Sequence, residues 1–359
     1  MRLTAVEVIP YALPFRRPYV TARGTLTRRE MVLLRLRTDE GIEGLGEAVP
    51  LSLRGGATLA QVVRELEEVE ESRALHDLID GGHLEYSSSR VLDPRLTLSL
   101  PSQCAVLTAL DDMRAKWAGD RYTPASVRCN ATLIAGEPLA VAEDAIAWQE
   151  EGFSTFKLKL GTGNDLELVR AVREVVGPIA KVRVDANAAW EMEEARRVLT
   201  ALQPLGIELA EQPMAAIEDC AALAELVIFP LAGDESITTL EEARLAAGIG
   251  AFQVTGIKLS KVGGYSAALN ISEALPAYVS SALDGPVGIA AGAALAGALD
   301  DDAELLGWPQ RAHGLATQRL FASTIASVEC ELIGGTLYPP PGPGLGIVID
   351  EDALQAHRI

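Results

Sequence analysis

The stretch Thr155-Phe-Lys-Leu-Lys-Leu160 carries apolar side chains at alternate positions around two lysines, which is typical of a short β-strand. Because successive side chains of a strand point to opposite faces, Lys157 and Lys159 should lie on the same face. Helical periodicity follows over residues 166–176, and a second short apolar strand follows at Lys181–Asp185. A strand and a helix therefore form one unit of the pattern.

Units of this kind recur from about residue 126, roughly every 25 residues. No G-x-G-x-x-G turn accompanies them, which disfavours a dinucleotide-binding fold. The recurrence therefore predicts an α/β fold with a (β/α) barrel of the TIM type. We expect its strands at residues 127–132, 155–160, 181–185, 208–211, 228–234, 251–259 and 277–283, and its helices at 166–176, 191–202 and 240–247.

The chain before the barrel has a different pattern, which predicts a small α+β domain. Asp39-Glu-Gly41 is a turn signal between two strand patterns, and Thr58 is a candidate N-cap. We expect strands at residues 3–13, 30–37 and 42–48, and helices at 58–71 and 103–117.

The last segment contains a run of prolines and glycines and fits neither a barrel strand nor a barrel helix. We expect it to pack on the first domain. The predicted domains are an α+β domain over residues 1–122, the barrel over 123–325, and a C-terminal segment over 326–359 that returns to the first domain.

Charged side chains stand at the ends of successive predicted strands, where barrel enzymes place their active sites. Neighbouring members of the series from Lys159 to Lys258 lie 23 to 26 residues apart, about one unit each. The series consists of Lys157, Lys159, Asp185, Glu211, Asp234 and Lys258.

Three carboxylates on adjacent strand ends repel one another, and a divalent cation with oxygen ligands relieves that repulsion. The four histidines do not fall on these strand ends, which disfavours zinc. The sequence therefore predicts a magnesium site made by Asp185, Glu211 and Asp234. Lysines beside it could act as a base or as an electrostatic partner, with pKa values lowered by burial near other cations.

Any one of these residues alone has a simpler interpretation. A strand-end Asp is most often a helix cap, and an isolated inward lysine usually forms an ion pair. The ordered series is what favours a functional site. Lys261, one turn beyond Lys258, is interpreted as a solvated loop residue.

Composition limits the partners. The chain has 359 residues with 31 basic and 50 acidic side chains, a net charge of −19 and a pI near 4.7. Without a basic block it is not expected to bind nucleic acid or an anionic membrane, although local lysines can hold a small carboxylate substrate. The four cysteines form no C-x-x-C pair and no signal peptide precedes them, so we expect a reduced, cytoplasmic protein. The sequence does not predict an oligomeric state.

The motifs around these residues resemble those of the enolase superfamily, and more narrowly its muconate-lactonizing-enzyme subgroup. The resemblance covers nearly the whole chain, including Gly41–Glu47 near the start and Gly344-Leu-Gly346 near the end. It is carried by Lys157-Leu-Lys159, Val184-Asp-Ala-Asn187, Ala210-Glu-Gln-Pro213, Gly233-Asp-Glu-Ser236 and Ile257-Lys-Leu-Ser-Lys-Val-Gly-Gly264.

The resemblance implies a barrel modified as in that superfamily, with the first domain as a capping domain over its mouth. It implies Mg²⁺, or Mn²⁺ as a substitute, on Asp185, Glu211 and Asp234. Lys159 would be the base, Lys258 would stabilise an ene-diolate by its charge, and Lys157 would support both the substrate carboxylate and Lys159. Asn187 and Glu235 would orient a ligand and a lysine.

Two further segments resemble o-succinylbenzoate synthases of the actinobacterial type: Asn130-Ala-Thr132 and residues 279–289. This resemblance implies a lyase that dehydrates 2-succinyl-6-hydroxy-2,4-cyclohexadiene-1-carboxylate to 2-succinylbenzoate in menaquinone biosynthesis. Ser280 and Ser281 could bind the succinyl carboxylate. So could a loop arginine, for which Arg23 is our candidate among Arg16, Arg17, Arg23 and Arg54.

Other activities remain open. An N-succinylamino-acid racemase or a dipeptide epimerase would use Lys159 and Lys258 as two bases. A muconate cycloisomerase is disfavoured by the segment that begins at Ser280. A barrel retained only as a binding protein would be expected to lack a ligand or a lysine, and none is missing.

Overall fold

The computed structural model describes residues 1–21, 24–52, 55–80, 97–161 and 163–359. Its first domain contains an antiparallel sheet in the order β1 (Leu3–Thr21), β2 (Gly24–Thr38) and β3 (Glu43–Ala48). The predicted strands are confirmed, and the first two are longer than expected. The turn between β2 and β3 lies at the predicted Asp39–Gly41, where Gly41 has a positive φ of 77°.

One face of this sheet packs on three helices, α1 (Leu59–Glu71), α2 (Ala74–Asp80) and α3 (Leu100–Ala118). Thr58 caps α1 by accepting a hydrogen bond from the Gln61 amide, as predicted. Two glycines of β3 let the sheet approach α3 closely. A Cβ at Gly46 would lie 1.9 Å from the carbonyl oxygen of Ala105, and one at Gly44 would lie 2.3 Å from that of Ala109.

The second domain is the predicted barrel, modified in its closure. Seven parallel strands follow one another in the order β5-β6-β7-β8-β9-β10-β11. Isolated parallel bridges from Cys129 to His313 and from Ser280 to Gly314 join the chain near residue 313 to both ends of this sheet. The strands are β5 (Ala131–Leu133), β6 (Thr155–Lys159), β7 (Lys181–Asp185), β8 (Ile207–Glu211), β9 (Leu231–Gly233), β10 (Val254–Ile257) and β11 (Ala277–Val279).

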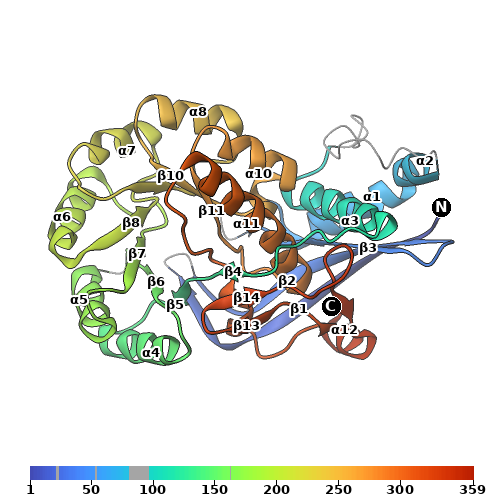
Figure 1. Cartoon of the computed structure of the whole chain (residues 1–359), viewed down its shortest axis with the longest axis horizontal. Coiled ribbons are helices and arrows are strands. Elements are labelled where there is room, and N and C mark those ends of the chain that lie inside the picture. Colours follow the sequence, from blue (N-terminus) through green and yellow to red (C-terminus); the bar gives the residue numbers. More distant parts are fainter. Residues whose placement is uncertain (22–23, 53–54, 81–96, 162) are drawn as a thin grey trace.

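Helices surround these strands as an outer ring (Figure 1). The predicted ones are confirmed as α5 (Asp165–Val176), α6 (Met192–Leu202) and α8 (Leu240–Gly248). The helices that were not predicted are α4 (Pro138–Glu150), α7 (Ile217–Ala224), α9 (Leu259–Val262), α10 (Tyr265–Ser272) and α11 (Pro286–Leu306). Helix α11 shows one reason: it is buried on nearly every side and rich in Ala and Gly, so its sequence has no amphipathic period.

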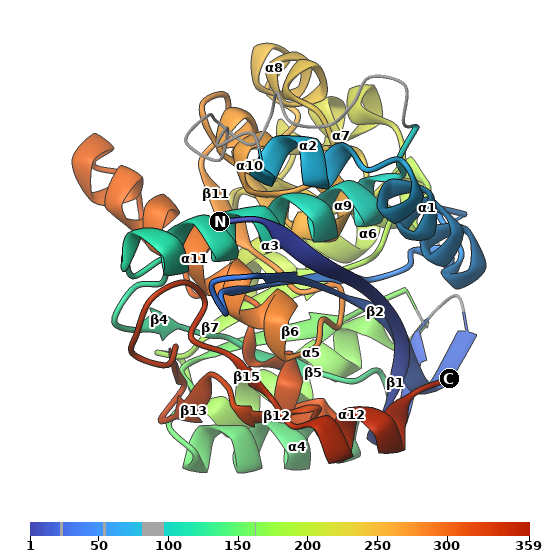
Figure 2. The same ribbon diagram turned by 90° about the vertical axis from the view of Figure 1, so that its right-hand side faces the viewer.

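The C-terminal segment contacts both domains. Its strand β14 (Thr336–Tyr338) pairs with β4 (Val127–Arg128) at the entry to the barrel. The Leu345 amide donates to Asp112 on α3 at 2.7 Å. Helix α12 (Glu351–His357) lies beside β1, and Figure 2 shows the C-terminus there. The remaining short strands are β12 (Ala326–Val328), β13 (Glu331–Ile333) and β15 (Val348–Ile349).

Within the described ranges, the helices are all too short or too polar to cross a bilayer.

Candidate active site

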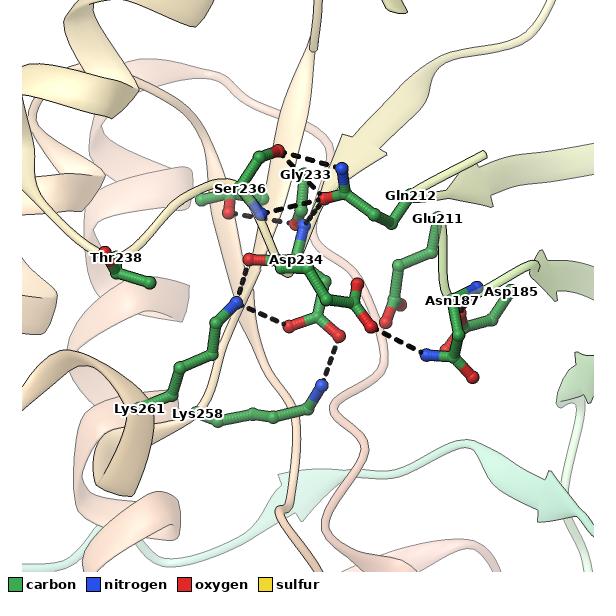
Figure 3. Close-up of polar contacts among 12 residues, drawn as sticks. Asp185, Asn187, Glu211, Gln212, Gly233, Asp234, Ser236, Thr238, Lys258 and Lys261 are labelled. Carbon is green, nitrogen blue, oxygen red and sulfur yellow. Dashed lines mark hydrogen bonds and ion pairs between the residues drawn. The ribbon is translucent and has the colours of Figure 1, made fainter. Parts of the chain in front are cut away.

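Three buried carboxylates meet at the carboxyl end of the barrel strands. Asp185 ends β7, Glu211 ends β8 and Asp234 directly follows β9. One oxygen of each carboxylate lies within 4.8 Å of one oxygen of each of the others, and none of the three residues is more than 1% exposed (Figure 3). Three hard oxygen donors so close together fit a divalent cation such as Mg²⁺.

A first pair of lysines reaches this cluster from β6. Lys157 Nζ lies 2.6 Å from Glu211 Oε1 and 2.8 Å from Asp185 Oδ2. Lys159 Nζ lies 2.6 Å from Asp185 Oδ2 and donates to Asn187 Oδ1 at 3.1 Å. Both side chains point into the same face, as the alternation along the strand predicts.

A second pair comes from the other flank, after β10. Lys258, the N-cap of α9, forms an ion pair with Asp234. Lys261 lies 2.9 Å from Asp234 Oδ1 and also donates to the backbone carbonyl of Asp234. The interpretation of Lys261 as a solvated loop residue is therefore wrong. Because α9 begins directly after the strand, it turns this side chain back into the site, where the residue is only 8% exposed.

Burial and the ion pairs together set the protonation of the site. Burial opposes ionisation of Asp185, but Lys157 and Lys159 hold the pKa of its carboxyl well below the usual range. Burial, and then the charge of Asp185, raises the pKa of Glu211.

The expected lowering of the lysine pKa values is not found in the metal-free site. Burial lowers the pKa of Lys157 and of Lys159, but the neighbouring carboxylates outweigh it and raise both. The closest charges to each ammonium group are negative rather than positive.

Neighbouring amides orient the acidic residues. The backbone amide of Asn187 donates to Asp185 Oδ1 at 2.9 Å, and its side-chain Nδ2 donates to Glu235 Oε1 at 3.1 Å. Gln212 Oε1 accepts from the backbone amide of Asp234 at 2.8 Å, so it fixes the loop that carries this carboxylate (Figure 3). The sequence motif contained Gln212, but its role was not predicted.

Tyr278 on β11 is a second residue that the sequence analysis missed. Its hydroxyl donates to Glu211 Oε2 at 2.5 Å, and the guanidinium of Arg183 lies 4.8 Å from the centre of its ring. The signal was present, since Tyr278 lies two residues before Ser280 and strand alternation places both on one face.

A cavity of about 500 Å³ lies over the carboxylates, between the capping domain and the barrel. Lys157, Lys159, Lys258 and Lys261 line it. From the capping domain it is lined by Tyr19, Leu26, Arg29, Pro50, Leu51, Gly56 and Leu100. Arg29 had not been considered because it stands in a polar run, Arg28-Arg29-Glu30, without clear alternation.

Ser280 and Ser281 also line this cavity. Ser280 is 5% exposed, and its Oγ has no hydrogen-bond partner in the described part of the chain. Ser281 Oγ donates to Asp284 Oδ2 at 2.6 Å.

Of the four loop arginines considered as substrate contacts, two can be placed in the structure, and each has a protein partner. Arg16 donates to the carbonyl of Arg319 at 3.1 Å, and Arg17 pairs with Asp144 at 2.8 Å. Arg23 and Arg54 lie outside the described residues.

Two family models match the chain. Residues 140–353 match the one described as "Enolase C-terminal domain-like". Residues 4–119 match "Mandelate racemase / muconate lactonizing enzyme, N-terminal domain". Together they cover most of the capping domain, most of the barrel and most of the C-terminal segment.

Similar proteins carry out different reactions. An o-succinylbenzoate synthase of Thermobifida fusca (strain YX) is 36% identical over 222 residues, covering 60% of this chain and 68% of that protein. An N-succinylamino acid racemase of an Amycolatopsis species is 30% identical over 377 residues, covering 97% and 95%. Epimerases and a cycloisomerase are also among the relatives.

The fold agrees with a solved structure of the same group. The dipeptide epimerase of Enterococcus faecalis V583, complexed with Mg and the dipeptide L-Leu-L-Tyr, aligns with a TM-score of 0.84 and 26% identity. The alignment covers 97% of this chain and 100% of that one. With its capping domain, its modified barrel and its lysine-flanked acidic triad, the chain belongs to the enolase superfamily.

Proposed function

We propose that this protein is an o-succinylbenzoate synthase, a lyase that dehydrates 2-succinyl-6-hydroxy-2,4-cyclohexadiene-1-carboxylate to 2-succinylbenzoate, a step of menaquinone biosynthesis. The main support is the complete set of three carboxylates with lysines on both flanks, which suits removal of a proton next to a carboxylate. The synthase from Thermobifida fusca, at 36% identity, favours dehydration among the reactions of the family.

Each group then has a role. Mg²⁺ held by Asp185, Glu211 and Asp234 would bind the ring carboxylate of the substrate and offset its growing negative charge. With the negative charge of Asp185 offset by the cation, which removes the main cause that raises the pKa of Lys159, the uncharged amine of Lys159 would take the α-proton, and the electron pair left behind would enter the ene-diolate. The resulting ammonium of Lys159 would give the proton to the departing hydroxyl on the same face, so that water leaves and the ring becomes aromatic.

The other lysines and the polar residues near the cavity complete this assignment. Lys258 would stabilise the ene-diolate by its positive charge, and Lys157 would hold the carboxylate and influence Lys159. Asn187 and Glu235 would keep the acidic groups and lysines in place. Ser280, Ser281 and Arg23 are the proposed contacts to the succinyl carboxylate, and buried Arg29 joins them as a donor that lines the cavity.

Racemisation of N-succinylamino acids is the second candidate. The Amycolatopsis racemase aligns with nearly the whole chain, whereas the synthase match spans 60% of it. Racemisation needs a base on each face of the substrate carbon, and Lys159 and Lys258 reach the cavity from opposite flanks of the acidic strands.

Parallel assays of the purified protein test the proposal. We expect Mg²⁺-dependent turnover of the cyclohexadiene substrate, followed by the absorbance of the aromatic product. The same preparation is incubated with each enantiomer of an N-succinylamino acid in deuterated buffer. Turnover of the amino acid alone, with exchange from both enantiomers, would overturn the synthase assignment in favour of the racemase.

A further inference from the structure

The stretch Gly44-Leu-Gly-Glu47 ends in a glutamate that the proposed chemistry does not use. The glycines are explained by their contact with α3, but the glutamate points elsewhere. Glu47 is 2% exposed and its carboxylate accepts a hydrogen bond from Tyr11 Oη at 2.8 Å. It also accepts one from the backbone amide of Gly285 at 2.7 Å, and the amide of Gly288 donates to it as well. A capping-domain carboxylate thus binds the N-terminal turn of barrel helix α11.

The barrel is shaped to receive this carboxylate. A Cβ at Gly285 would lie 2.3 Å from Tyr11 Oη and 2.7 Å from Glu47 Oε2. A Cβ at Gly288 would lie 2.7 Å from Glu47 Oε1. Any larger residue at either position would push the two domains apart at this contact.

On the barrel side, the contact continues into a wall of the substrate cavity. Asp284, next to Gly285, accepts from Ser281 Oγ at 2.6 Å and from the Ala282 amide at 2.8 Å. Ser281, Ala282 and Leu283 line the cavity. Leu283 has a positive φ of 66°, a strained conformation that its surroundings must hold in place.

On the capping side, Glu47 comes shortly before the residues that form the opposite wall of the cavity. Three residues after Glu47, the carbonyl of Pro50 accepts from Arg29 at 2.9 Å. Pro50, Leu51 and Gly56 line the cavity opposite the barrel residues. The hydrogen bond between Glu47 and Gly285 therefore lies within a few residues of both walls of the cavity, the capping wall that begins at Pro50 and the barrel wall that ends at Leu283.

We propose that Glu47 is a positioning residue that joins β3 to the start of α11 and thereby fixes residues 280–284 against Pro50, Leu51 and Gly56 around the substrate. The effect on catalysis rests on the proposed function, whereas the joint itself does not. Glu47 touches no reacting atom, so its influence should act on substrate binding more than on the chemical step.

Amide hydrogen exchange in the absence of substrate tests the joint. Glu47→Leu removes the acceptor and keeps the volume, and we expect exchange in peptides covering residues 280–289 to accelerate at least about tenfold. Glu47→Gln keeps one acceptor oxygen for the two glycine amides and should restore most of the protection. Glu65→Leu is the matched control. Glu65 is a buried capping-domain glutamate, 8% exposed, that accepts from Ser99 and Ser102 of the same domain.

The result is decisive in either direction. Unchanged exchange over residues 280–289 in Glu47→Leu, or equal acceleration in Glu65→Leu, would overturn the proposal. If Glu47→Leu does not fold, Glu47→Asp is used, since its shorter side chain withdraws the carboxylate from Gly285, and normal protection in that variant would count against the joint.

Steady-state kinetics add the catalytic readout. With the cyclohexadiene substrate we expect Glu47→Leu to raise KM about tenfold while kcat changes less than threefold, and Glu65→Leu to change neither by that much. A wild-type protein that does not turn over this substrate would refute the proposed function but leave the exchange result intact.

Discussion

The two lysine pairs that flank the carboxylates reach them through different backbone geometry. Lys157 and Lys159 project from one strand at a spacing of two residues and divide their contacts between Asp185 and Glu211. Lys258 and Lys261, a strand end and one helical turn beyond it, converge on Asp234.

This difference separates two tasks. The strand pair is held by the sheet, so the two amines have fixed positions over two carboxylates, as a base and its partner require. The pair at α9 instead surrounds one carboxylate with positive charge and fixes its direction. The flanks should therefore respond differently to substitution.

The largest effect is expected from weakening the metal site that lies between the two lysine pairs. Glu211→Gln removes one anionic oxygen ligand, and the metal's contribution of several kcal/mol corresponds to a loss of activity of more than about 10⁴-fold. Mn²⁺ binding, followed by electron paramagnetic resonance, should weaken in parallel. Asp144→Asn, a surface carboxylate paired with Arg17, is the control and should leave both unchanged. Full activity after chelation and dialysis would contradict this prediction.

The comparison sharpens when one lysine of each flank is replaced. Lys159→Ala should lower dehydration by about 1,000-fold because it removes the proton shuttle. Lys258→Arg keeps the charge but cannot act as a base, so it should leave measurable dehydration and abolish racemisation. Both variants are assayed with the cyclohexadiene substrate and with an N-succinylamino acid in deuterated buffer. Equal loss of dehydration in the two variants would remove the distinction between the flanks.

The same contrast explains what the sequence could predict. Strand alternation was enough to place Lys157 and Lys159 together, and the regular spacing of units placed Asp185, Glu211 and Asp234 at adjacent strand ends. The barrel was predicted from the same recurrence, whereas the family was inferred from the resemblance of the motifs around these residues.

The residues that were missed depend on local geometry rather than on period. Lys261 was misplaced because a four-residue helix, too short for a helical period, turns it inward. Arg29 is buried beside the cavity between the capping domain and the barrel, a position that strand periodicity does not predict. Tyr278 had a usable signal in strand alternation, but its partner Arg183 lies about four strands away in the sequence, and such a contact requires the closed barrel.

A smaller effect is expected from Lys261→Met. The change leaves Asp234 buried with Lys258 as its remaining lysine, so the metal-free protein should lose about 2 kcal/mol of unfolding free energy, less than for breaking an isolated buried pair. Mg²⁺ should restore more stability to this variant than to wild type, because the cation replaces the missing charge. Lys181→Met removes an ion pair to Glu208 from a side chain that is 51% exposed, and should cost less than about 1 kcal/mol. A Mg²⁺ stabilisation equal to that of wild type, measured by denaturant unfolding, would count against this role of Lys261.

The smallest effect is expected at Tyr278. It tests whether Glu211, a partner of the β6 lysines, is also held by a hydrogen bond from the barrel interior. Tyr278→Phe deletes the hydroxyl that donates to Glu211 Oε2 but keeps the ring against Arg183. Since outer hydrogen bonds orient metal ligands, Mn²⁺ affinity should fall about tenfold, with kcat at saturating metal reduced less. Tyr122→Phe is the matched control, because it removes a tyrosine hydroxyl that bonds Asp111 far from the cavity. Equal Mn²⁺ affinity in the two variants would show that the Tyr278 hydroxyl does not help to hold Glu211. The two lysine pairs would then differ only in which carboxylates their ammonium groups contact.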